Sequence, residues 1–218
     1  MDLKTQEDEA YEQLRDLILA GELAVGEFLS QRMLASRVGA AVITVRGALR
    51  RLENDGLIEN VPRWGVRIPR ETEEQIQDRY FVREVLELAA LRRLGGTLGA
   101  REAEELLVLA RHCDELGAKG SKDARAFAEA HLAFHRFLPD CCGSRMLKVF
   151  LERLNLQSLM LFNAQRGWAR GVDRDAPHHE KLARILSAGD VERAETQLRE
   201  HIRRGLDNEL AAFQAKKG

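Results

Sequence analysis

Residues 30–69, SQRMLASRVGAAVITVRGALRRLENDGLIENVPRWGVRIP, constrain the fold more than any other stretch of the chain. Their apolar spacing predicts two short helices, over residues 31–38 and 42–54. Gly39 lies between them and suits the left-handed conformation that ends a helix. The second helix has one apolar face, formed by Val45, Ala48, Leu49 and Leu52. The segment therefore predicts two helices joined by a tight turn.

A short hairpin is expected directly after the second helix. An Asp-Gly pair stops that helix, and the apolar residues 57–58 and 66–68 flank a turn that carries Pro62 and Gly65. Helix, turn, helix and hairpin in this order form a winged helix-turn-helix. Its second helix is the natural candidate for a DNA major groove, and an Arg-Trp pair forms the tip of the wing.

Positive charge is concentrated in the same segment. Residues 30–70 contain eight arginines against three acidic residues, net +5, whereas residues 1–29 contain two basic residues against eight acidic ones, net −6. Because the whole chain has a formal net charge of −1, a nucleic-acid contact has to be confined to one face. The alternative is a small helical domain with solvated arginines. It does not explain why the arginines coincide with the second helix and the wing.

Length and composition bound the other possibilities. The chain has 218 residues, 44% of them hydrophobic and 32% charged, which is ordinary for a globular protein of one or two domains with a real core. No apolar run approaches the roughly 18–20 residues of a transmembrane helix, and the acidic start lacks the pattern of a signal peptide. Reduced thiols in a cytoplasm are the simplest account of Cys113, Cys141 and Cys142. We expect a cytoplasmic protein without membrane contact.

The rest of the chain is expected to be helical. Thr72 is a candidate N-cap, which places a domain boundary at about residue 70. Apolar spacing then predicts six helices, over residues 73–94, 101–117, 121–140, 144–166, 175–188 and 190–214. Their broad apolar stripes argue for an antiparallel bundle. The predicted fold is mainly α, with a winged helix-turn-helix in residues 1–70 and a bundle of about six α-helices in residues 71–218.

The segment from Tyr11 to Ile68 resembles the N-terminal domain of GntR-type bacterial transcription regulators. The matching stretches are YEQLRDLILAGELAVGEFLSQRMLASRVG and VRGALRRLENDGLIENVPRWGVRI, and the remainder resembles the FadR-like branch with its all-helical effector domain. The resemblance implies a homodimer that binds a near-palindromic, double-stranded DNA operator. The candidate DNA contacts are Arg32, Thr44, Arg46, Arg50, Arg63 and Trp64.

Residues 41–44 depart from the family pattern, which is Ser-Arg-Thr-Pro or similar at these positions. A Ser or Thr at position 41 would cap the recognition helix, so Ala41 costs roughly 1 kcal/mol of capping. Val42 replaces an arginine that often touches DNA, and valine can donate neither to a phosphate nor to a guanine edge. We therefore expect DNA binding to survive, with an operator or an affinity that differs from the family norm.

Four of the six histidines fall on the inner faces of predicted bundle helices. His131 and His135 are four residues apart, so their rings project from one helical face. His179 and His201 lie on the apolar stripes of two later helices. Hydrogen bonds in the core satisfy a single buried imidazole. Several converging imidazoles are more readily satisfied by a divalent metal.

The resemblance strengthens the metal hypothesis. Many effector domains of the FadR-like branch hold a metal with one Asp and three His, and the spacing puts His135, His179 and His201 on the three His positions. His131 falls on the Asp position, so this chain offers four imidazoles, unless His131 is displaced and only three bind. Replacing the carboxylate removes one negative charge and favours zinc or nickel over magnesium or manganese.

Two further residues are candidates for effector binding. Arg83 and Glu87 match an Arg-x-x-x-Glu feature near the start of the family's effector domain. They form either an ordinary i, i+4 ion pair, worth about 0.3–0.5 kcal/mol, or a site in which Arg83 grips the carboxylate of a small organic acid. Asn163, a polar residue in an otherwise apolar helix, could line the same cavity.

These features together predict a ligand-responsive DNA-binding transcription regulator. The predicted regulator is a repressor that senses a small carboxylate at an internal metal site. One alternative is a regulator whose bundle holds no metal and serves dimerisation or metal-independent ligand binding. A more remote alternative is a histidine-metal hydrolase. The hydrolase leaves the first 70 residues unexplained, and the HxxxH pair lacks the Glu of HExxH, so we do not expect an enzyme.

Overall fold

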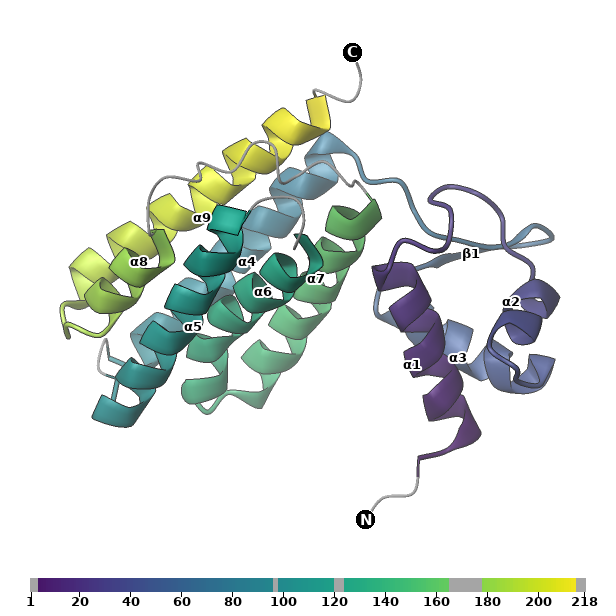
Figure 1. Ribbon diagram of the computed structural model, residues 1–218, viewed down its shortest axis with the longest axis horizontal. Coiled ribbons are helices and arrows are strands. Elements are labelled where there is room, and N and C mark those ends of the chain that lie inside the picture. The colour runs from purple at the N-terminus through teal and green to yellow at the C-terminus, as the bar shows by residue number, and fades with distance from the viewer. Residues whose placement is uncertain (1–3, 96–97, 120–123, 165–177, 215–218) are drawn as a thin grey trace. The chain divides into compact units, whose positions relative to one another are not determined.

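The computed structural model describes residues 4–95, 98–119, 124–164 and 178–214, with the side chains of 119, 124–125 and 155–164 left aside. The chain divides into two compact units, the first consisting mainly of Met1–Glu71 and the second mainly of the residues from Thr72 onward. In Figure 1 the first unit runs from purple to blue and the second from blue through green to yellow. Each unit is described by itself below.

The first unit is a small helical domain with a two-stranded sheet. Its elements are α1 (Gln6–Leu19), α2 (Gln31–Arg37), α3 (Val42–Asn54), β1 (Glu59–Val61) and β2 (Gly65–Arg67). Both α1 and α2 pack against α3. The core side chains are at most 2% exposed and include Leu14, Ile18, Leu34, Val45, Leu52 and Ile68. Because the apolar stripe of α3 is committed to this core, its opposite face is left for solvent or a partner.

The predicted hairpin is present, but its first strand begins later than predicted. β1 and β2 are antiparallel with Val61 opposite Gly65, so three residues form the turn. The strand predicted over residues 57–58 is wrong. Leu57 and Ile58 are 0% and 5% exposed, and they link α3 to the sheet as part of the core instead of pairing with β2.

The segment before α2 extends the small sheet. Leu29 and Val66 exchange two backbone hydrogen bonds, of 2.7 and 3.2 Å, and the N–H of Gly26 donates to the carbonyl of Ile68 over 2.9 Å. These bonds run along the side of β2 that does not face β1. The wing is therefore anchored on both sides, which holds its tip in a defined position relative to α2.

The second unit is a helical bundle. Its helices are α4 (Glu73–Arg93), α5 (Ala100–Lys119), α6 (Ala124–Cys141), α7 (Arg145–Ala164), α8 (His178–Leu186) and α9 (Val191–Gln214). α4 packs against α6 and α9, α5 packs against α6 and α8, and α8 packs against α9 (Figure 1). The predicted fold class, mainly α with a winged helix-turn-helix and a helical bundle, is confirmed. Among the described helices, none is long and apolar enough to cross a membrane.

Contacts between α4 and α9 fix the positions of these helices relative to each other. Arg79 of α4 donates to Glu209 of α9 over 2.6 Å, and both side chains are nearly buried. Near this pair the helices approach closely, since a Cβ added to Gly205 would lie 3.2 Å from a ring carbon of Tyr80. A buried ion pair adds little net stability, but it penalises other registers of the two helices. The residues that α4 and α9 contribute to the bundle interior are therefore held in register.

Candidate metal centre and DNA-reading surface

The exposed face of α3 carries two of the candidate DNA contacts. Ile43, Arg46 and Arg50 follow one another at helical spacing along this face and are exposed. The Arg46 Nε donates a hydrogen bond over 3.3 Å to the Oε1 of Gln31 in α2, which orients the guanidinium. The face therefore has the charge and the position of a recognition helix in a helix-turn-helix.

The first turn of α3 lacks a side-chain cap. Ala41 is its N-cap residue and makes no side-chain hydrogen bond, although its carbonyl accepts the N–H of Val45 over 3.0 Å. The absence of a side-chain cap at Ala41, which the sequence predicted, is thus seen in the structure. Of the other candidate contacts, Arg32 is exposed on α2, whereas Thr44 is half-buried and lies off the exposed stripe.

The wing tip presents one arginine and an aromatic pair. Arg63 adopts a positive φ of 72°, which turns the chain tightly between the two strands. Trp64 is 68% exposed, and its ring lies 5.3 Å from that of Phe28. The guanidinium of Arg67 lies over the Phe28 ring. The wing therefore offers a cationic and aromatic surface, and Phe28 and Arg67 are parts of it that the sequence did not single out.

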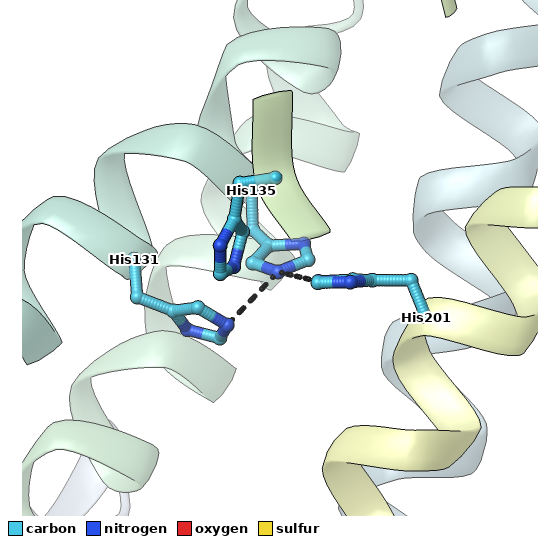
Figure 2. Close-up of side chains that lie close together, drawn as sticks. His131, His135 and His201 are labelled. Atoms are coloured by element: carbon cyan, nitrogen blue, oxygen red, sulfur yellow. Dashed lines mark hydrogen bonds between the residues drawn. The ribbon is translucent and has the colours of Figure 1, made fainter. Parts of the chain in front are cut away.

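Four histidines from three helices converge inside the bundle. His131 and His135 come from α6, His179 from α8 and His201 from α9, and one ring nitrogen of each lies within 4.8 Å of those of the others. The Nε2 of His135 lies 3.2 Å from the Nε2 of His131 and 3.2 Å from that of His201. Figure 2 shows these three rings directed toward one another, with His135 between the other two.

A buried carboxylate on α4 orients His135. The Oε2 of Glu87 lies 2.7 Å from the Nδ1 of His135. An ionised Glu87 accepts a hydrogen bond from the Nδ1–H, which leaves the lone pair of Nε2 facing the other histidines. Burial raises the pKa of Glu87 to about 7, although the nearby Arg83 opposes this shift. Burial also lowers the pKa values of His131, His135 and His201 well below their usual range. The rings are therefore held neutral, which is the protonation state of a metal ligand.

A second carboxylate, on α5, orients His179. The Oδ1 of Asp114 lies 2.7 Å from the Nδ1 of His179, and Asp114 also accepts the backbone N–H groups of His179 and Glu180 at the start of α8. Burial by itself would raise the pKa of Asp114, but these hydrogen bonds lower it. Sequence patterns carried no signal for this role, because Asp114 lies 65 residues before its partner. Cys113 was missed too, and its Sγ lies 3.6 Å from the Nε2 of His179.

Arg83 is buried beside the same cluster. Its Nε donates to Glu87 over 2.7 Å, so the predicted i, i+4 ion pair is present, but it is buried and not a weak surface pair. The Nη2 of Arg83 is also buried and has no hydrogen-bond partner within the described part of the chain. Its charge contributes to the low pKa of His135. Arg83 thus combines the ion pair with a free donor group. The side chain of Asn163, the other candidate, lies outside the described residues.

The geometry of the four imidazoles fits a divalent metal. Two nitrogens bound tetrahedrally to one metal at 2.0–2.1 Å lie about 3.3 Å apart. The two Nε2 separations at His135, 3.2 Å each, match this value. The cluster as a whole extends to 4.8 Å, so it is more open than a closed tetrahedral site. Four imidazoles without a carboxylate suit zinc, nickel or copper better than magnesium or calcium.

Asp114→Ala is expected to lower the affinity for zinc by about 10- to 100-fold, because the orientation of His179 is lost. Asp114→Asn should fall between this variant and the wild type, since its amide oxygen can still accept from the ring. Competition against a chelating zinc indicator measures both. Glu115→Ala changes an exposed acid in the next position and serves as the control. Wild-type affinity in Asp114→Ala would contradict the role assigned to this carboxylate.

Comparison with known families accounts for both units. The family described as bacterial regulatory proteins, gntR family, matches residues 6–68, and the FCD domain family matches residues 78–204. The chain belongs to the GntR family of bacterial transcription regulators. The winged helix-turn-helix of this GntR regulator is its DNA-binding domain, and its bundle is an FCD domain.

Individual GntR regulators match over most of their length. The chain is 30% identical over 196 residues to the HTH-type transcriptional regulator YdhC of Bacillus subtilis (strain 168), which covers 88% of this chain and 76% of that protein. It is 28% identical over 201 residues to the HTH-type transcriptional repressor GlaR of Escherichia coli (strain K12), with coverages of 89% and 91%. A solved transcriptional regulator GntR from Rhodococcus sp. RHA1 superposes with a TM-score of 0.77 over 96% of this chain and 99% of that one. At 24% identity, that structure supports the fold alone.

This membership decides between the classes of function considered for the sequence. The chain is a DNA-binding transcription regulator and not an enzyme, so the histidine-metal hydrolase is excluded. The histidine cluster lies in the FCD domain, which is separate from the DNA-binding domain. The question that this cluster raises is therefore whether it serves in sensing, since catalysis is excluded.

Proposed function

We propose that this regulator is a repressor whose bundle senses a small organic acid at an internal metal site. Residues 1–70 bind the operator, and residues 71–218 bind the effector and form the dimer. The observation that carries the proposal is the convergence of four imidazoles beside a buried guanidinium, one nitrogen of which has no partner among the described residues. The repressor role is supported by two relatives named as repressors, GlaR and a probable D-xylose utilization operon repressor of Paenarthrobacter nicotinovorans.

The proposed metal is zinc or nickel, held by His131, His135, His179 and His201. When bound, such an ion supplies a Lewis acid that attracts carboxylate or water oxygens. The residues of the chain orient the ligand rings and set their protonation. Glu87 and Asp114 orient His135 and His179 toward the cluster, and burial keeps the His135 ring neutral by lowering its pKa. The four-imidazole set contains no carboxylate that would offset the charge of a divalent ion, so the bound ion would favour an anionic effector.

Arg83 is the proposed anchor for the effector carboxylate. Its Nε is occupied by Glu87, whereas its Nη2 is buried and lacks a partner among the described residues. A buried guanidinium nitrogen left unsatisfied costs free energy that an incoming carboxylate oxygen would recover. Because Glu87 touches both Arg83 and His135, an effector bound to Arg83 changes the environment of the metal ligands as well.

Operator binding is proposed to involve a homodimer in the bacterial cytoplasm, associated with the nucleoid. Two copies would place their α3 helices in successive major grooves of a near-palindromic site. The bundle offers a dimerisation surface, since Phe81, Val82 and Val85 of α4 are 68%, 39% and 51% exposed. Effector binding would change operator affinity if the two arrangements of the dimer differ in their affinity for the acid.

A thermal-shift screen of metal-loaded protein with small mono- and dicarboxylic acids tests the effector. An acid at 100 times its Kd should stabilise the protein by about 2.7 kcal/mol, or roughly 5–10 °C in Tm. Arg83→Gln should abolish the shift while retaining the metal. Arg92→Gln, which changes an exposed arginine on the same helix, should keep the shift.

The alternative function is a regulator whose bundle holds no metal. It is favoured by the hydrogen bonds that His135 and His179 already make to Glu87 and Asp114, because these bonds satisfy one ring nitrogen of each histidine. Acid-induced stabilisation that persists after exhaustive chelation would support this alternative over the metal-dependent proposal.

A further inference from the structure

The exposed face of α3 combines two kinds of chemistry. Arg46 and Arg50 supply positive charge, whereas Ile43, in the first turn, is an apolar side chain that is 67% exposed. Val42, next to it, is 36% exposed. Their exposure is unusual within this helix, because its other large apolar residues are at most 5% exposed and form the core.

An apolar group in this position has a specific counterpart in duplex DNA. The N-terminal residues of a recognition helix meet base edges in the major groove. Among the four base pairs, only those with thymine present a methyl group there, and apolar side chains contact it. The neighbouring arginines hold the helix in the groove through charge complementarity. We propose that Ile43 reads the 5-methyl group of one thymine in each operator half-site.

The spacing along α3 limits where this thymine lies. Ile43 and Arg46 are three residues apart, about 4.5 Å along the helix axis, and base pairs are stacked about 3.4 Å apart. Arg46 is oriented by Gln31 and has the fork geometry that suits O6 and N7 of guanine. The thymine read by Ile43 therefore lies one or two base pairs from a guanine read by Arg46.

The test uses full-length protein and duplexes that it selects from a random-sequence library. Each thymine of the selected half-site is replaced in turn by deoxyuridine, which removes only the methyl group. The wild type should lose affinity about three- to fivefold at one thymine, in line with the burial of one methyl group. Ile43→Ala should bind the thymine and deoxyuridine duplexes equally, whereas Ile43→Val should keep most of the discrimination.

The measured quantity is the ratio of two affinities, so a general loss of binding or of folded protein cancels. Val108→Ala removes another exposed apolar side chain, 55% exposed, from α5 and should leave the ratio at the wild-type value. Wild-type protein that is indifferent to the methyl group at every thymine would overturn the inference. So would an Ile43→Ala protein that keeps the same discrimination. Failure to select any duplex would contradict DNA binding itself and the inference with it.

Discussion

His135→Ala protein is expected to contain almost no metal, whereas the wild type should purify with a near-stoichiometric amount. His135 is the central ring, 3.2 Å from two of its neighbours, and it is the ligand that Glu87 orients. Loss of a residue that only orients a ligand costs about 10- to 100-fold in affinity, so loss of the ligand itself should cost at least 100-fold. Mass spectrometry of metals in untagged protein measures the effect.

His112→Ala is the matched control for this substitution. His112 is exposed on α5, outside the cluster, so its removal should leave the metal content unchanged. Circular dichroism on both variants checks that the bundle is folded. Equal metal in His135→Ala and the wild type would remove the cluster as the binding site, and absence of metal from all three proteins would favour the metal-free alternative.

The metal-free protein is expected to lose stability in mild acid. The pKa values of His131, His135 and His201 are lowered by burial, whereas in the unfolded chain they return to about 6.5. Below pH 6.5 the unfolded chain therefore binds more protons than the folded one, and the free energy of unfolding falls as the pH falls. Glu87 acts in the opposite direction between pH 4.5 and 7, because its folded pKa is raised to about 7.

Three histidines outweigh one carboxyl group in this window. From pH 6.5 to 5.5 each histidine lowers the free energy of unfolding by about 1 kcal/mol, and Glu87 raises it by about the same amount. We therefore expect the free energy of unfolding to fall by about 2 kcal/mol in total. Urea unfolding in the presence of a chelator, followed by circular dichroism, measures the change. His201→Gln should reduce the loss by about 1 kcal/mol. A free energy of unfolding that is flat or rises over this window would show that the rings are not held neutral.

Most of the fold followed from apolar spacing. The apolar stripes of α3 and of the bundle helices could be recognised in the sequence because each helix buries one face. The predicted helix ends lie within three residues of those observed. The first strand was misplaced because Leu57 and Ile58 are apolar and look like a strand. Apolar character alone does not distinguish a residue that pairs in a sheet from a residue that packs into the core beside the sheet.

The candidate metal centre was only partly accessible from the sequence. The four histidines could be grouped because two of them are four residues apart and the others lie on apolar stripes. Asp114 could not be linked to His179, because their contact depends on how α5 packs against α8. At Arg83 the sequence offered two alternatives that the structure makes compatible. One nitrogen of the guanidinium binds Glu87, and another has no partner in the part of the chain that the structure describes.

The bond between Asp114 and α8 would tie local folding to the occupancy of the proposed metal site. α8 spans only His178–Leu186, and a helix of this length is marginal by itself in water. The Asp114 carboxylate accepts the backbone N–H groups of His179 and Glu180 in the first turn of α8 and also contacts the ring of His179. If His179 holds a metal as proposed, opening of α8 breaks a ligand bond, and binding of the ion raises the free energy of that opening. Occupancy of the proposed site would then set how often one edge of the bundle unfolds and becomes open to solvent.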